Sequence, residues 1–311
     1  MALTVPKNQR LHRFIIFTTF VTFLLIIAGG LVTGNEAGLS VPDWPLSYGS
    51  LMPPMEGNIR YEHSHRIIAA LVGLLTIILN LWLWRSTEPK HVRILGLITL
   101  FVVISQGILG GISVIFLLPL LVSVSHACLA QIFFSMMVIL SLLTSSNWKL
   151  PQTKIIDDSK PTLKFFCYAI PITIFLQLIL GSVLRHSKGT IHPHLTGALF
   201  VSILVVWASL RVLYNHPQQW NIVRVALLLV GLLFVQLLLG TGSFLMRLTT
   251  GDSPQPTVPL VAVTTAHVAA GALILAASLV FAFETIRSIS ITNNPLKTVS
   301  KTLVSDTVKS L

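Results

Sequence analysis

Four histidines occupy positions where ionisable side chains are rare, in or at the mouth of long apolar segments. They are His65, His126, His194 and His267, out of ten histidines in the chain. One such histidine is equally well explained by a hydrogen bond between helices. Four are not, because one falls on every second apolar segment, near the same end each time. A neutral imidazole is the usual axial ligand of haem iron, so this pattern predicts two sites in which paired imidazoles face a porphyrin.

Charged residues beside these histidines suggest further roles. Glu62 lies three residues before His65, so the two share one face if a helix has begun there. An acid at the edge of a membrane segment costs free energy, which makes Glu62 a functional candidate. Arg66 and Arg185 are expected to contact haem propionates, with snorkelling to the membrane surface an equal alternative. A di-iron site needs more carboxylates than this single Glu-x-x-His pair offers.

The composition identifies the class of protein that positions these residues. Of 311 residues, 53% are hydrophobic and 10% are charged, and the mean hydropathy is +0.83. Soluble domains carry about 25% charged residues. These values exclude a soluble enzyme, a disordered chain and a nucleic-acid-binding domain. They predict an all-α integral membrane protein, because helices satisfy every backbone polar group in lipid.

Eight segments are long and apolar enough to cross a bilayer, at about 20 residues each. Two of them form one uncharged run from Ile94 to Trp148, which Pro119 is expected to divide into two helices. The predicted spans are Phe14–Thr33, Ile67–Trp84, Ile94–Phe116, Leu121–Leu143, Phe165–Leu184, His194–Leu213, Val223–Leu245 and Leu260–Phe283.

The basic residues divide unevenly between the two membrane faces. With eight spans, sixteen lysines and arginines fall on the side of the termini and five on the other side. Cytoplasmic loops carry the excess of positive charge, so both termini are expected in the cytoplasm of a cell (inner) membrane protein. This asymmetry also explains the net charge of +11 without a nucleic-acid partner. The five are Arg60, Arg66, Arg185, Lys188 and Arg247.

The spans form two sets of four that resemble each other. Gln106-Gly-Ile-Leu-Gly in the third span has a counterpart in Gln236-Leu-Leu-Leu-Gly in the seventh. The order and spacing predict two pseudo-symmetric four-helix bundles, with residues 1–148 in one half and 149–311 in the other. Several glycines are expected to let a porphyrin approach the backbone, namely Gly107, Gly110, Gly111, Gly197, Gly240 and Gly271.

Several motifs are similar to those of the haem A synthase family. They are Ala37-Gly-Leu-Ser-Val-Pro-Asp-Trp-Pro45, Glu62-His-Ser-His-Arg66, Gln106-Gly-Ile-Leu-Gly-Gly111, Ser125-His126, Leu184-Arg-His186, His194-Leu-Thr-Gly-Ala198 and Ala266-His267. The resemblance extends over nearly all of the chain. One departure concerns the cysteine pair that some members carry in the first outer loop, because Val41 stands at one of those positions.

The resemblance implies oxidation of the C8 methyl group of haem O to a formyl group, giving haem A for terminal oxidases. It implies that His65 and His126 flank the iron of the substrate haem O in the first half. It further implies that His194 and His267 ligate a haem b cofactor in the second half, and that Glu62 is catalytic. Haem O and membrane lipid are the expected partners. Two further points are left open: contact with haem O synthase or with terminal oxidase assembly, and a homo-oligomeric state.

Two choices of histidine and the class of function have alternatives. His63 competes with His65, and His192 with His194, because two residues turn a helix by about 200° and only one of each pair can face a haem. The family motifs favour His65 and His194. A di-haem cytochrome that only transfers electrons fits the four histidines equally well. A transporter that relays protons through them predicts no bound haem.

Overall fold

The computed structural model describes residues 9–187, 189–250 and 255–290, and within these ranges the chain is helical without strands. Eight long helices have the length and apolarity needed to cross a membrane, which confirms the predicted class. A ninth helix, α5 (Ser146–Lys149), is a single turn. The long helices are α1 (Gln9–Gly34), α2 (Ile59–Arg85), α3 (Lys90–Ile115), α4 (Leu120–Thr144), α6 (Leu163–His186), α7 (His192–Asn215), α8 (Trp220–Thr250) and α9 (Val258–Ser288).

The helices are longer than the spans predicted from hydropathy. They contain 24 to 31 residues, or about 36 to 46 Å, which exceeds the roughly 30 Å hydrocarbon layer. Their outer faces carry exposed large apolar side chains such as Phe20, Phe101 and Phe234, as expected of surfaces that contact lipid. Pro119 is the residue before α4, and Leu117 and Leu118 with positive φ form the turn that precedes it, so the predicted division is confirmed.

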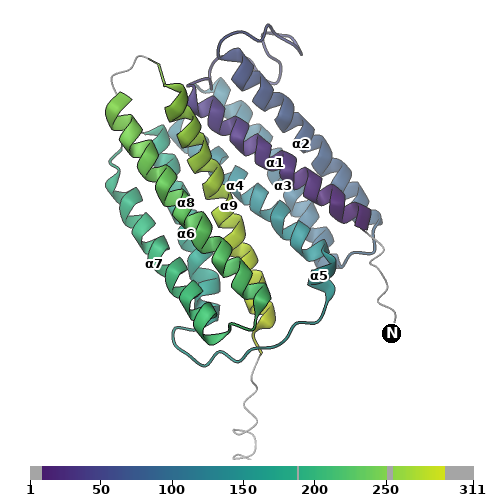
Figure 1. Cartoon of the computed structure of the whole chain (residues 1–311). Helices are drawn as coiled ribbons and strands as arrows, with labels where there is room; N and C mark the ends of the chain where they lie inside the picture. The colour runs from purple at the N-terminus through teal and green to yellow at the C-terminus, as the bar shows by residue number, and fades with distance from the viewer. Residues whose placement is uncertain (1–8, 188, 251–254, 291–311) are drawn as a thin grey trace, which may run out of the picture.

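The long helices pack in two rings of four. In the first ring, α1 contacts α2, α2 contacts α3, α3 contacts α4 and α4 contacts α1, and the second ring repeats this order from α6 to α9. Helices α1 and α4 join the two groups by packing against α9, and α4 also contacts α6. Figure 1 shows the purple-to-teal group beside the green-to-yellow one, with α9 at the junction. The assignment of separate halves with different haems stays a prediction.

Small residues allow the two groups to approach closely. A Cβ atom on Gly30 of α1 would lie 2.9 Å from Thr265 Cγ2 of α9, and one on Gly34 would lie 2.8 Å from Val261 Cγ1. Small residues at such contacts are the usual way for membrane helices to pack, because van der Waals contact then drives association.

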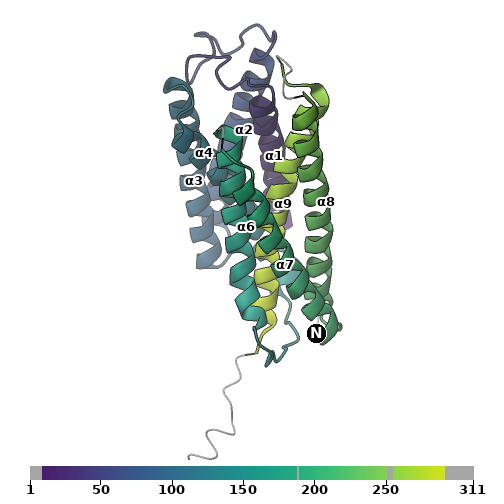
Figure 2. The same cartoon turned by 90° about the vertical axis from the view of Figure 1, so that its left-hand side faces the viewer.

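The start of α1 and the end of α9 lie on the same side of the molecule (Figure 1), as expected for eight crossings. The loop of residues 35–58 covers the opposite end of the first group, above α1 and α2 (Figure 2). The helices that carry the four histidines, α2, α4, α7 and α9, all begin at this loop end. The sequence positions of the histidines therefore place them all toward one face.

Candidate functional site

Each of the four histidines packs against a glycine on the long helix that precedes its own. Because glycine has no side chain, the imidazole ring can lie directly against the neighbouring backbone. A Cβ atom on each glycine would lie 3.0 to 3.3 Å from the imidazole Cε1 atom, closer than ordinary contact. The pairs are His65 with Gly29, His126 with Gly110, His194 with Gly181 and His267 with Gly240.

The imidazoles also face backbone carbonyl groups and keep buried nitrogen atoms free. Each ring approaches the backbone of the residue four positions before its glycine, which is Leu25, Gln106, Gln177 or Gln236. Within the described ranges, Nδ1 of His65, His126 and His267 nevertheless makes no hydrogen bond of normal geometry. Buried polar atoms without partners are rare and costly in native proteins. Four rings seated on glycine, three of them with an unpaired Nδ1, fit ligands for a group bound between them.

The histidines come together in two pairs, each from helices on opposite sides of a ring. The ring centroids of His194 and His267 are 6.3 Å apart, with the ring planes at 75°. His65 and His126 interact electrostatically in the first group. Two metal–imidazole bonds of about 2 Å each, together with the two ring radii, span a distance comparable to that between His194 and His267. Each pair therefore supplies a two-imidazole donor set of the kind that a haem iron uses.

The structure distinguishes the competing histidines by where their rings lie. His63 Nδ1 lies 2.9 Å from Ser47 Oγ, so this ring contacts the outer loop and not the interior of the helix group. His192 is exposed at the start of α7, whereas His194 faces Gly181 and His267. His65 and His194 are thus the inward residues of the two alternatives.

Glu62 and Arg66 fasten the outer loop to α2. The buried Glu62 carboxylate accepts hydrogen bonds from the backbone N–H of Val41 at 2.8 Å and from Arg66 Nη2 at 2.5 Å. Arg66 also donates to the carbonyl oxygens of Val41 at 3.1 Å, and of Asp43 and Leu46 at 2.7 Å each. Since the Arg66 guanidinium already holds the loop, its expected contact with a propionate stays a prediction.

Arg185 lies half-buried near the end of α6 at the same face as the four histidines. Among the described residues it makes no hydrogen bond or ion pair, and its charge interacts with those of Arg247 and Glu36. A guanidinium without a carboxylate partner beside a second arginine favours an anion at this position. Its expected contact with a propionate likewise stays a prediction.

The outer loop has an internal framework of its own. The Asp43 carboxylate accepts hydrogen bonds from the backbone N–H groups of Gly49 at 2.8 Å and Tyr48 at 2.6 Å, which lower the pKa of this carboxyl group. The indole of the neighbouring loop residue Trp44 packs against Gly111 of α3. A Cβ atom on Gly111 would lie 2.7 Å from Trp44 Cδ2. Gly111 therefore accommodates this indole, and not a porphyrin as the sequence analysis expected.

Three glutamines contact the histidines, and the sequence analysis assigned them no role. Gln106 Nε2 donates to the His126 carbonyl oxygen at 2.9 Å, and Gln177 Nε2 donates to that of His194 at 2.8 Å. Gln236 Nε2 lies 3.4 Å from His267 Nε2. The signal was present in the sequence, because Gln177-Leu-Ile-Leu-Gly181 repeats the Gln-x-x-x-Gly spacing already noted for Gln106 and Gln236.

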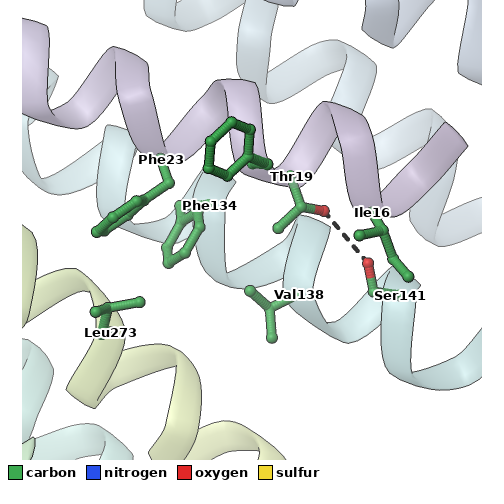
Figure 3. A pocket seen from close by; sticks show the side chains of 8 residues that line it. Ile16, Thr19, Phe23, Phe134, Val138, Ser141 and Leu273 are labelled. Carbon is green, nitrogen blue, oxygen red and sulfur yellow. Dashed lines mark hydrogen bonds between the residues drawn. The ribbon is translucent and has the colours of Figure 1, made fainter. Parts of the chain in front are cut away.

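An apolar groove of about 350 Å³ lies outside this site, between α1, α4 and α9. Figure 3 shows Phe23 and Phe134 beside each other at one end and the Thr19–Ser141 hydrogen bond, with oxygen atoms 3.3 Å apart, at the other. None of the four histidines lines this groove. Within the described ranges, no cluster of three or more His, Cys, Asp or Glu side chains is placed to hold a metal ion.

Comparisons with known proteins relate the chain to one family. Residues 12–60 and 58–193 match the COX15-CtaA family, described as cytochrome oxidase assembly protein. The chain is 29% identical to a heme A synthase from Shouchella clausii over 189 residues, covering 59% of the chain and 62% of the relative. It is 25% identical to that of Alkalihalophilus pseudofirmus over 257 residues, covering 72% and 85%. The chain thus spans less than two thirds of the first relative, and the family match ends before His194.

Proposed function

The chain belongs to the COX15-CtaA family of cytochrome oxidase assembly proteins, and on this basis we propose that it is a membrane-bound haem A synthase. The proposed reaction oxidises the C8 methyl group of haem O to a formyl group. The observation that carries the proposal is the fourfold arrangement of histidine against glycine, in which His194 lies 6.3 Å from His267 between ring centroids and His65 interacts with His126. The names of the relatives support the same activity.

We propose different roles for the two groups of helices. In the half formed by residues 1–148, His65 and His126 hold the iron of the substrate haem O. In the half formed by residues 149–311, His194 and His267 hold haem b as a resident cofactor. The distance between the two imidazoles supports a haem site in the second half, and the choice of haem b comes from the resemblance to the family, although both histidines lie beyond the family match. When bound, the haem b group supplies redox chemistry that side chains lack, since none of them can accept electrons from a methyl group.

Glu62 is the proposed catalytic residue. It lies three residues before His65 on α2, so a haem held by His65 would have the Glu62 carboxylate on the same face of the helix. The Val41 N–H and Arg66 each contact one carboxylate oxygen, which holds the group in one orientation at a buried position. A fixed carboxylate can accept a proton from the reacting methyl group or stabilise positive charge that develops there. The outer loop held by Arg66 limits the access of water to this position.

The location and partners follow from the charge distribution and the proposed substrate. We propose a cell-membrane protein with both termini in the cytoplasm, based on the excess of basic residues on that side. We propose that haem O enters the first half from the membrane. The proposed partners there are the enzyme that makes haem O and the proteins that assemble terminal oxidases. Arg66 and Arg185 are proposed to contact propionates at the outer face.

The test is expression of the chain in cells that supply haem O, followed by extraction and chromatography of the haems. We expect haem A with the wild-type protein and a loss of at least tenfold with Glu62→Gln, since general acid–base groups contribute about 100-fold or more. Glu284→Gln is a matched control. Glu284 is also buried, but it lies near the C-terminal end of α9, whereas His267 lies near the start of that helix. Bound haem without any haem A would instead support a cytochrome that only transfers electrons.

A further inference from the structure

Unused hydrogen-bond acceptors lie beside three of the four imidazoles. The amide oxygens of Gln106, Gln177 and Gln236 are buried, and within the described ranges none has a hydrogen-bond partner. A buried acceptor without a partner is costly, so such groups are expected to gain a partner in the working state. Gln177 and Gln236 contact the imidazole rings of His194 and His267 through Nε2, and Gln106 Nε2 donates to the backbone carbonyl of His126.

A histidine that binds a metal through one ring nitrogen almost always donates the N–H of the other nitrogen to an acceptor. Such acceptors fix the orientation of the ring and make it a stronger ligand. In His126 and His267 the buried Nδ1 has no hydrogen-bond partner among the described residues, and the same is true of the amide oxygens of Gln106 and Gln236. An amide that turned its oxygen toward the ring would supply the acceptor that the ring N–H needs.

The fourth histidine lacks this support. The residue that corresponds to the glutamines, four positions before Gly29, is Leu25, whose side chain has no polar atom. His65 faces only the backbone of Leu25, and its buried Nδ1 has no partner among the described residues. The two helix groups therefore differ in one respect: both ligands of the second group have a glutamine, whereas one ligand of the first group does not.

We propose that Gln106, Gln177 and Gln236 are positioning residues for haem ligands, and that Leu25 makes His65 the most weakly held ligand. This inference rests on the proposed function and deepens it. A substrate haem must leave after each reaction, whereas a cofactor must stay. The missing glutamine makes α1–α4 the group that exchanges its haem, and the paired glutamines make α6–α9 the group that retains it.

The experiment follows the transfer of haem from the purified full-length protein, loaded with iron protoporphyrin IX in detergent, to an excess of apomyoglobin. We expect a fast phase from the first group and a slow phase from the second. Leu25→Gln is expected to slow only the fast phase, by about 10-fold or more, and Gln236→Leu to accelerate only the slow phase, by about 10- to 100-fold. The low-spin electron paramagnetic resonance signal of the affected haem is expected to shift in both variants.

Two matched variants separate this effect from general changes in packing. Leu25→Met keeps an apolar side chain and is expected to leave the fast phase unchanged. Gln131→Leu removes another buried amide of α4 whose oxygen also lacks a partner, but among the described residues no hydrogen bond joins Gln131 to a histidine, so neither phase is expected to change. Wild-type rates and signals in Leu25→Gln or in Gln236→Leu would overturn the inference alone. A colourless wild-type protein would overturn the proposed function together with it.

Discussion

The substitution Gly240→Ala tests whether His267 is held against the backbone of α8. A Cβ atom at this position would lie 3.1 Å from His267 Cε1 and 3.6 Å from Nδ1. Ordinary contact begins near 3.4 Å, so the imidazole must move by about 0.3 Å or tilt away. Functional groups generally need to be held within about 0.5 Å, and loss of the support around a metal ligand costs about 10- to 100-fold in affinity. We therefore expect a drop in haem affinity of at least several-fold.

Helix stability changes in the opposite direction, which makes the result specific. Alanine is favoured over glycine inside a helix by about 1 kcal/mol, so the variant is expected to fold at least as well as the wild type. Gly231→Ala is the matched control, because Gly231 lies on the same helix and a Cβ atom there would meet nothing within 4 Å. The assay is a haem titration followed by the reduced-minus-oxidised spectrum, with thermal unfolding measured in parallel. Equal haem affinity in the two variants would refute the proposed seating of His267.

Two further predictions concern the outer loop. Arg66→Gln removes the donors to three loop carbonyls and to Glu62, so we expect faster proteolysis of residues 35–58 and at least a tenfold loss of haem A formation; a loop as resistant as the wild type would contradict this role. Backbone N–H groups lower the pKa of Asp43, so its contribution to loop order is complete above the ordinary Asp pKa and is lost as pH falls through the lowered value. Trp44 fluorescence is expected to report this transition in acid, and a transition unchanged in Asp43→Asn would exclude Asp43 as its cause.

Sequence patterns were sufficient for the membrane helices, whereas the roles of the four histidines stay a prediction. The apolar segments and Pro119 gave all eight spans, because length and hydropathy are dictated by the bilayer. The helices extend beyond the predicted spans because charged and polar residues near their ends reduce the local hydropathy. Glu62 and His65, for example, already lie on α2. The choice of His65 over His63 depended on a family motif and agrees with the direction of both rings.

Other features of the site could not be derived from one sequence. The hydrogen bonds of Arg66 reach residues 20 to 25 positions away in an irregular loop, where no periodic pattern exists. The partner of each glycine depends on how neighbouring helices are rotated against each other, and hydropathy does not determine that rotation. This is why Gly111 was expected beside a porphyrin, whereas it accommodates Trp44. The third Gln-x-x-x-Gly segment was visible but gains its meaning only from contact with His194.

The pairing of histidine with glycine has a consequence for biogenesis. Every His–Gly contact joins two helices that follow each other among the long helices of the chain. Each imidazole therefore packs against a glycine of its own helical hairpin. A hairpin can be complete as soon as it leaves the insertion machinery, before later segments have been synthesised. Each His–Gly contact therefore needs only its own two helices, whereas the two histidines of a pair come from different hairpins and meet only when those hairpins dock.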